Sequence, residues 1–327
     1  MDVLTDMLAR SRARGAGFAY STLHGATGVS LPPGPGLGVH VIVDGEAWLC
    51  LDSGAEPVRV ATGDVLVVQG ARAHRVAVIP DTPCVPLVDL MARGPLAPSS
   101  RHYAVGDLDA PVSSVFFCGA YMFEGDLCRQ LLAELPDLVT VRSRAGSTLR
   151  ATTDLLGREV LSDAAGQQIL LDRLLDVALV QVLRQHFDEA GAAAPPWFRA
   201  SADPAIGAAL RALHADPAAP WTVATLATEA SLSRGAFARR FRELLGVPPL
   251  TYLTDWRMAL ARERLRDGDE GLAVVAEAAG YRSEFAFAAA FKRHHGTSPG
   301  RWRTARRRAE AVDVNLGRAE GQGRRPV

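Results

Sequence analysis

The spacing of apolar residues changes along the chain, and the change separates two kinds of structure. Between residues 39 and 90, short apolar runs alternate with turn residues such as Gly54, Gly63 and Gly70. Many short runs at this spacing are typical of strands in a small barrel or sandwich. From residue 127 onward the apolar residues recur every three or four positions, which indicates helices. The pattern therefore predicts an α+β chain, with a β-barrel first and an all-α region last.

Two features of the barrel region are specific enough to predict individual strands. The apolar runs 39–43 and 47–51 flank Asp44-Gly45. Asp-Gly between two such runs favours a tight turn with positive φ, so we expect a hairpin here. Residues 112–123 add one or two further strands.

Three helices are expected after the barrel, at residues 127–135, 150–161 and 167–187. The last of these has a wide apolar face, which comprises Leu171, Leu174, Leu175, Ala178 and Val182. A face of this width must be covered, either by the barrel or by a second copy of the chain. A homodimer is therefore a possible assembly.

The C-terminal region contains one motif twice, at residues 226–249 and 275–299. Corresponding residues lie 49 apart before the turn of each copy and 50 apart after it, so the turns differ by one residue. Each copy predicts a short helix, a tight turn and a longer helix, with Ser233 or Ser283 as the N-cap of the longer one.

Each longer helix carries two phenylalanines four residues apart, Phe237 and Phe241 in the first copy and Phe287 and Phe291 in the second. This spacing places both rings on one face, which we expect to be buried. Such a unit is a helix-turn-helix, whose second helix can enter a major groove. The intervening helix, residues 250–266, is roughly 25 Å long, so it can hold two recognition helices about 34 Å apart, one turn of duplex.

Charge and composition support a division into domains. Residues 1–202 hold 16 basic and 22 acidic side chains, whereas residues 203–308 hold 17 basic and 11 acidic ones. A basic part of this kind favours a polyanionic partner. Residues 191–196, Gly-Ala-Ala-Ala-Pro-Pro, are typical of a linker. We expect a first domain at 1–190, which also carries the candidate dimerisation helix, a linker at 191–202, a DNA-binding domain at 203–308 and a disordered tail at 309–327.

The composition also indicates the cellular compartment in which we expect the protein. No apolar run approaches the ~20 residues of a membrane-spanning helix, and the acidic N-terminus does not resemble a signal peptide. The four cysteines are scattered and none is in a Cys-x-x-Cys pair. This usage favours reduced thiols, so we expect a cytoplasmic protein without membrane contact.

Residues 203–304 resemble the DNA-binding domain of AraC-type transcriptional regulators. The matching stretches include Trp221-Thr222-Val223, Ser231-Leu232-Ser233-Arg234, Phe237-Ala238-Arg239-Arg240-Phe241, Trp256-Arg257-Met258, Gly280-Tyr281 and Gly296-Thr297-Ser298-Pro299. Residues 1–190 resemble, less strongly, the cupin-like sensor domain of one branch of that family. The resemblance implies regulation of transcription, with double-stranded DNA, a small-molecule effector and RNA polymerase as partners. It leaves activation and repression both open.

The resemblance also implies which residues face DNA in the first recognition helix. These are Arg234, Gly235, Ala238 and Arg239, and Arg239 matches the base-contacting arginine of the family. We expect Arg240 to meet phosphates or solvent rather than bases.

The second recognition helix departs from the family pattern, because Ala289 stands where arginine is usual. The residues expected toward the groove are Glu284, Phe285, Ala288 and Ala289, with Lys292 and Arg293 near the end of the helix. Alanine can touch a thymine methyl but has no hydrogen-bonding group. This helix is therefore expected to position the protein more than to specify sequence.

The barrel region holds an incomplete metal-binding pattern. Cupin enzymes bind a metal through a His-x-His pair, a glutamate and a later histidine; here His40, Glu46 and His74 are present, but Ile42 replaces the second histidine. We therefore expect no metal and no cofactor. His40, Trp48 and His74 are candidates to line an effector site at the barrel mouth.

Cys118 and Cys128 flank an expected strand-to-helix junction. Free cysteines are most often core residues, and a thiol switch that biases DNA binding is the alternative.

Three classes of function remain open. The first is a one-component transcriptional regulator with no enzymatic activity. The second is a metal-dependent cupin enzyme fused to a DNA-binding domain, and the third is a structural DNA-binding protein without sequence preference, whose affinity would fall steeply with salt for every sequence. The duplicated motif favours the first.

Overall fold

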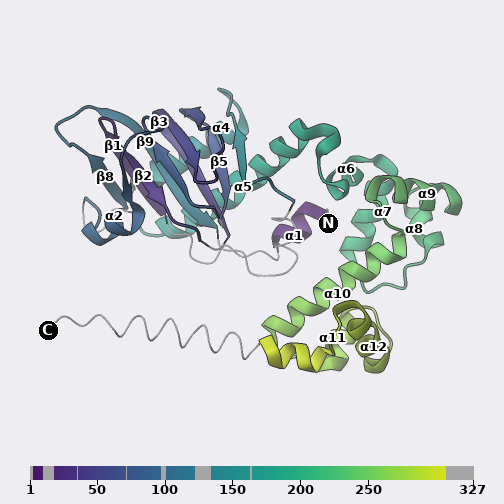
Figure 1. The fold of residues 1–327 in the computed structure, drawn as a ribbon. Helices are drawn as coiled ribbons and strands as arrows, with labels where there is room; N and C mark the ends of the chain where they lie inside the picture. The colour runs from purple at the N-terminus through teal and green to yellow at the C-terminus, as the bar shows by residue number, and fades with distance from the viewer. Residues whose placement is uncertain are drawn as a thin grey trace. The chain divides into compact units, whose positions relative to one another are not determined.

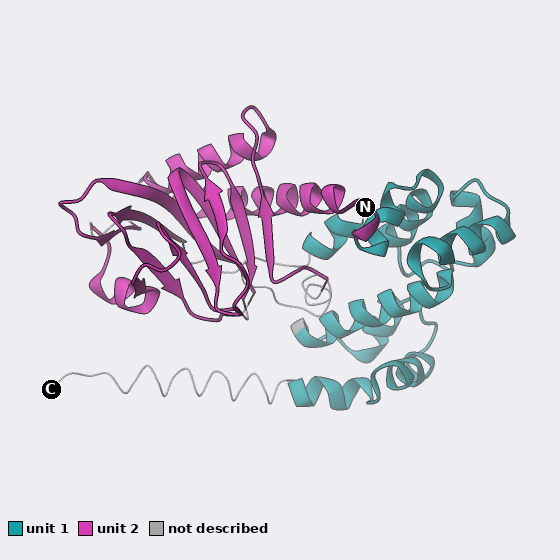
Figure 2. Cartoon of the chain, turned by 45° about the horizontal axis from the view of Figure 1, so that its top comes forward, with its two compact units in different colours: residues 1–9, 125–127, 195–327 teal, residues 10–124, 128–194 magenta. Residues whose placement is uncertain are grey.

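The computed structural model describes residues 3–9, 18–34, 36–70, 72–96, 101–121, 134–162 and 164–306. The chain divides into two compact units (Figure 2). We call them the barrel unit, which holds the described residues 18–121 and 134–194, and the helical unit, which holds 3–9 and 195–306. The expected domain boundary near residue 191 lies close to this division, but the first residues of the chain belong to the helical unit.

The barrel unit is a strongly curved mixed sheet with two helices at its C-terminal end (Figure 1); β1 and β8 pair in parallel, as do β2 and β7, and the other pairs are antiparallel. Its strands are β1 (Phe18–His24), β2 (Gly28–Leu31), β3 (Leu37–Leu51), β4 (Val58–Ala61), β5 (Val65–Gln69), β6 (His74–Ala77), β7 (Cys84–Pro86), β8 (His102–Gly106), β9 (Val112–Tyr121) and β10 (Leu138–Val141). A short helix, α2 (Leu87–Arg93), follows β7. The strand order is β7-β2-β6-β3-β9-β1-β8, with β4 and β5 also paired to β3 and β10 paired to β5.

The central strand β3 corrects the expected hairpin at Asp44-Gly45. Residues 37–51 form one continuous strand, whose first half pairs with β5 and β9 and whose second half pairs with β4 and β6. The register with β9 shifts between Ile42 and Asp44, and Gly45 has a φ of +77°. The positive-φ glycine therefore serves a β-bulge that bends the strand, and the hairpin prediction is wrong.

Every second side chain along the strands points into the barrel, and these inward side chains form its apolar core. Leu49, Leu66, Val76 and Phe116 are almost fully buried in one apolar cluster. Because side chains point to alternate faces of a strand, their neighbours in sequence face outward. The same alternation determines which of the candidate side chains lie on one face of the sheet and can contact each other.

Two long helices close the barrel unit, α4 (Thr148–Val160) and α5 (Gln167–Ala190). They confirm the helices expected at 150–161 and 167–187. The expected apolar face of α5 is buried through Leu171, Leu175, Ala178 and Val182, against α4 and β10. Most of the expected helix at 127–135 lies outside the described residues, and so does the tail at 309–327.

The helical unit is made of short helices around two repeated hairpins. They are α1 (Val3–Ala9), α6 (Pro196–Ala202), α7 (Pro204–Ala215), α8 (Val223–Glu229), α9 (Arg234–Leu245), α10 (Pro249–Asp267), α11 (Leu272–Ala278) and α12 (Glu284–His295), and residues 299–306 are also helical. Part of the expected linker is therefore structured: residues 191–193 form a 3₁₀ turn, and α6 buries Trp197 and Ala200.

A buried polar chain fixes α1 inside the helical unit. The Asp6 carboxylate lies 3.0 Å from His214 Nδ1 in α7, and His214 Nε2 lies 2.9 Å from the Tyr252 hydroxyl in α10. Burial, with the nearby Asp6 carboxylate, raises the pKa of Tyr252 well above its ordinary value, so this hydroxyl stays protonated and can donate. Removing one partner would leave buried polar groups without hydrogen bonds, which is costly.

Among the described residues, no helix is both long and apolar enough to cross a membrane.

Candidate functional site

The first hairpin of the repeat consists of α8, a tight turn and α9. Thr222 begins α8 with a reciprocal capping box to Thr225. The turn places Ser231 at a φ of +53°, and the Leu232 N–H donates to the Ala227 carbonyl over 3.0 Å. The Ser233 hydroxyl then accepts from the N–H of Ala236 and caps α9.

The second hairpin repeats this geometry with α11 and α12. Gly280 takes the left-handed position at a φ of +75°, and the Tyr281 N–H donates to the Ala276 carbonyl over 2.9 Å. Ser283 caps α12 by accepting from the N–H of Ala286. Since Ser231 and Gly280 are 49 residues apart while the two caps are 50 apart, the extra residue of the second turn is Arg282.

The expected phenylalanine stripes are buried in both hairpins. Phe237 and Phe241 of α9 are completely buried, as are Phe287 and Phe291 of α12. The opposite faces of α9 and α12 are therefore the ones available to a partner.

The outward face of α9 is open and basic. Arg234, Gly235 and Arg239 are exposed, and Ala238 is half-buried. The Arg239 side chain is 73% exposed, and its Nε lies 3.9 Å from the Glu243 carboxylate on the same helix. An exposed pair at this distance contributes little, so the guanidinium is available to a ligand.

Arg240 is committed within the helical unit. Its Nε and Nη2 donate to the same oxygen of the Asp203 carboxylate, over 2.9 and 2.5 Å. Asp203 also caps α7 by accepting from the N–H groups of Ala205 and Ile206. Arg240 thus holds α9 against the start of α7.

The outward face of α12 carries fewer cations. Glu284, Phe285, Ala289, Lys292 and Arg293 are exposed, and Ala288 is half-buried. Phe285 is 89% exposed, the largest value among the exposed large apolar residues of the described chain. The two cations stand in the last turn, as expected from the sequence.

Helix α10 joins the two hairpins, and Arg257 ties it to both. The Arg257 guanidinium donates to the carbonyls of Pro217 and Ala219, which lie just before α8. A Cβ added to Gly280, in the turn before α12, would lie 2.6 Å from Arg257 Nη2. One side chain therefore packs against elements of both hairpins.

Comparison with known proteins identifies the family. A helix-turn-helix domain model matches residues 226–305, and a cupin model matches residues 2–188. A putative AraC-like transcription regulator of Streptomyces lividans is 32% identical over 306 residues, which cover 93% of this chain and 98% of the relative. The chain belongs to the AraC family of transcriptional regulators.

A second named relative agrees with this assignment, and a solved structure resembles about a third of the chain. The transcriptional regulator AlkR of Acinetobacter baylyi is 26% identical to this AraC-type regulator, over 93% of this chain and 99% of the relative. A crystal structure of the DNA-binding domain of AdpA with a target DNA is 36% identical and covers 33% of this chain and 96% of that one, with a TM-score of 0.31. This AraC-type protein is a DNA-binding regulator with a cupin domain, as the sequence led us to expect.

The barrel unit brings two of the three candidate effector residues together. His40 Nε2 and His74 Nε2 are 2.8 Å apart, and both rings are buried. His74 Nδ1 lies 3.0 Å from the Arg72 carbonyl, so it carries a proton, and His74 Nε2 accepts from His40. His40 Nδ1 is then an acceptor, and it has no partner among the described residues. Burial lowers the pKa of both rings, which keeps the pair neutral.

Trp48 does not join this pair. In the pairing of β3 with β6, His74 lies opposite Leu51 and Val76 opposite Leu49, so these side chains share the inner face. Trp48 alternates with Leu49 and faces outward, opposite Arg59 of β4. The three residues therefore do not line one site.

The residues of the cupin metal pattern do not fit a metal. Glu46 is exposed, and its carboxylate binds Arg59 over 2.5 Å. Ile42 supplies no ligand, and the described residues contain no group of three or more His, Cys, Asp or Glu side chains suited to a metal ion. His40 and His74 form a hydrogen bond to each other instead. The geometry and the names of the relatives favour the regulator over the metal-dependent enzyme.

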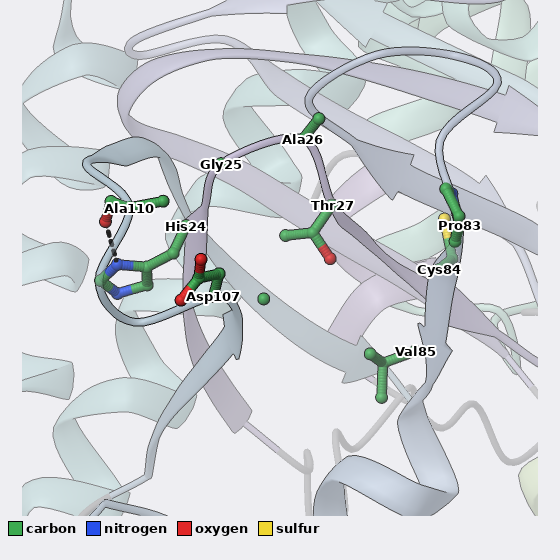
Figure 3. Close-up of a pocket in the computed structure, with 10 residues that line it drawn as sticks. His24, Gly25, Ala26, Thr27, Pro83, Cys84, Val85, Asp107 and Ala110 are labelled. Carbon is green, nitrogen blue, oxygen red and sulfur yellow. Dashed lines mark hydrogen bonds between the residues drawn. The ribbon is translucent and has the colours of Figure 1, made fainter.

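A cavity of about 460 Å³ opens elsewhere on the barrel (Figure 3). It is formed by the β1–β2 turn, the start of β7 and the β8–β9 turn, and its lining includes His24, Thr27, Val85 and Asp107. His24 Nδ1 lies 3.0 Å from the Ala110 carbonyl, which holds the ring at the edge of the cavity. No sequence pattern could indicate this site, because its walls come from three separate segments of the chain.

Of the two cysteines of the expected thiol switch, the described residues include Cys118. Burial raises the pKa of the Cys118 thiol to about 12, which disfavours the reactive thiolate. Cys128 lies outside the described residues, so a switch between the two cysteines stays a prediction.

Proposed function

We propose that this regulator inserts α9 and α12 into two successive major grooves, with Arg239 as the principal base-reading residue. The observation that carries this proposal is the outward, uncommitted Arg239 on the face opposite the buried Phe237 and Phe241. Arginine can donate two hydrogen bonds to the O6 and N7 of guanine. Arg234, Gly235 and Ala238 complete the proposed face of α9, and Glu284, Phe285, Ala288 and Ala289 form that of α12.

The remaining cations are assigned to other roles. Lys292 and Arg293 lie at the end of α12, where phosphate contact is the natural use of an exposed charge. Arg240 is proposed as a positioning residue, since Asp203 already binds its guanidinium.

The test begins with selection of bound sites from random duplex DNA by the full-length protein. Arg239→Ala is expected to weaken binding by about 1–3 kcal/mol and to relax base preference at one position. Arg242→Ala is the matched control, because this neighbouring exposed arginine should weaken binding equally for all sequences. An unchanged base preference in Arg239→Ala would contradict the proposal.

We further propose that the cupin domain binds a small-molecule effector in the cavity shown in Figure 3. The cavity combines apolar walls with the polar groups of His24 and Asp107, which suits a small polar or amphipathic compound. Thermal unfolding against a metabolite library should give hits for the wild type that are lost in Ala110→Phe, a cavity-filling variant. Compounds that still stabilise Ala110→Phe but no longer stabilise the His40→Leu/His74→Leu double variant would instead place the effector site at the histidine pair.

The proposed assembly is a homodimer. Leu155 of α4 and Ile169, Leu170 and Val177 of α5 are 46–67% exposed, on a face not used by the barrel core. A second copy that covers this face would bury several large apolar side chains.

Family membership supports the remaining proposals. A regulator acts where the chromosome and RNA polymerase are, so we propose the cytoplasm as its location and the polymerase as its partner. We also propose a sensor domain at 1–190, apart from α1, which folds with the helical unit, joined by 191–202 to a DNA-binding domain at 203–308. The lack of enzymatic activity completes the proposal.

A further inference from the structure

The outward faces of the two recognition helices differ in chemistry, although the helices hold equivalent places in the repeat. At four positions, 50 residues apart, the pairs are Arg234 and Glu284, Gly235 and Phe285, Ala238 and Ala288, and Arg239 and Ala289. Helix α9 thus presents two guanidinium groups where α12 presents a carboxylate and a methyl group. After Glu284, the face of α12 is hydrocarbon until Lys292.

Phe285 is the prominent side chain of this face. It extends from the first turn of α12 and is 89% exposed, whereas Phe287, Ala290 and Phe291 fill the core beneath the helix. An aromatic ring left in water contributes nothing to packing, so the fold of the hairpin does not require it. Because Phe285 occupies the position of Gly235 on α9, it lies on the face that the repeat turns toward DNA.

The major groove offers one apolar group to such a face, the C5 methyl of thymine. We propose that α12 selects thymine through this methyl group, and that Phe285 makes the discriminating contact. Ala288 and Ala289 allow close approach of the helix, and Lys292 and Arg293 hold the neighbouring phosphates. The inference rests on the proposed placement of α12 in the groove, and it assigns sequence specificity to a helix that lacks a base-reading arginine.

Deoxyuridine isolates this contact, because it removes only the methyl group of thymine and keeps the base pair. Full-length protein would be titrated onto duplexes of the selected site by fluorescence anisotropy. Each thymine one helical turn from the Arg239-dependent position would be replaced singly. For the wild type we expect about fourfold weaker binding at one or two positions, the equivalent of about 0.8 kcal/mol for one buried carbon group.

The variant Phe285→Ala should bind the thymine and deoxyuridine duplexes equally well at those positions, and Phe285→Leu should keep part of the difference. Deoxyuridine substitutions near the Arg239-dependent position are the internal control, since Phe285→Ala should not change their effect. Circular dichroism verifies the fold, which an exposed side chain should not alter.

Equal binding of thymine and deoxyuridine by the wild type at every position under α12 would overturn the inference. Full discrimination retained in Phe285→Ala would overturn it too, and would assign Phe285 to another partner, such as a protein surface. If Arg239→Ala still relaxes base preference, the proposed function stands without this inference. If Arg239→Ala has no effect either, the placement of both helices is wrong.

Discussion

At the scale of single residues, the buried histidine pair shows how the barrel accommodates polar side chains. His40 and His74 satisfy each other and the Arg72 carbonyl, and one nitrogen of His40 stays without a partner among the described residues. Because both rings are buried, charging either one would cost desolvation, so the pair is most stable while both rings are neutral.

This neutrality predicts a pH dependence. Burial lowers the pKa of both rings in the folded state, so below the ordinary histidine pKa of about 6.5 the unfolded chain binds more protons than the folded chain. The free energy of unfolding should therefore fall as the pH drops from 7 to 5. Urea unfolding of the His40→Leu/His74→Leu double variant should show a weaker pH dependence than the wild type. Equal slopes for the two proteins would disprove the role of the pair.

Residue identities predicted which side chains of α9 and α12 face outward more reliably than they predicted contacts. The outward residues of α9 and α12 follow from the helical period and the buried phenylalanines, and the structure exposes them. The bond between Arg240 and Asp203 joins residues 37 apart, and that between Asp6 and His214 joins residues 208 apart. Neither spacing leaves a periodic signal, so the sequence alone could not predict these contacts.

At the scale of elements, local signals predicted helices well and one turn badly. The bounds of α9 and α12 follow from apolar spacing and from their serine caps, Ser233 and Ser283. Asp44-Gly45 failed as a hairpin signal because a positive-φ glycine serves a bulge as well as a turn. Which of the two forms depends on the partners of β3, and those lie far away in sequence.

The turn of the second hairpin allows a sharp test of its geometry. Gly280→Ala should destabilise the protein by about 1–3 kcal/mol, because Gly280 has a φ of +75° and a Cβ there would lie 2.9 Å from the Ala218 carbonyl oxygen. Gly235→Ala is the matched control: a Cβ at Gly235 meets nothing within 4 Å, so this variant should be neutral or gain up to about 1 kcal/mol. Thermal unfolding of both variants measures the difference, and equal stabilities would show that the turn is not formed as described.

At the scale of the whole molecule, the order of the sequence and the division into units do not coincide. Helix α1 comes from the region expected to be part of the sensor domain, yet it folds with the helical unit through Asp6. Composition could indicate two domains, since the net charge changes sign between them. It could not show that the first helix of the chain folds with the C-terminal domain.

The proposed homodimer is tested at this scale. Ile169→Asp and Val177→Asp place charges on the exposed face of α5 and should convert a dimer to a monomer in sedimentation velocity. Asp172→Asn, on the same helix but outside the apolar patch, is the control. A dimer that survives both aspartate substitutions would exclude this face, and a monomeric wild type would exclude the assembly.

The central claim is that two recognition helices of one chain enter the same side of a duplex. Hydroxyl-radical footprinting of the full-length protein on its selected site tests it most directly. The account predicts two protected backbone segments, each bordering a major groove, about one helical turn, 10–10.5 base pairs, apart for each bound chain. A single protected segment, or uniform protection that ignores sequence, would contradict it.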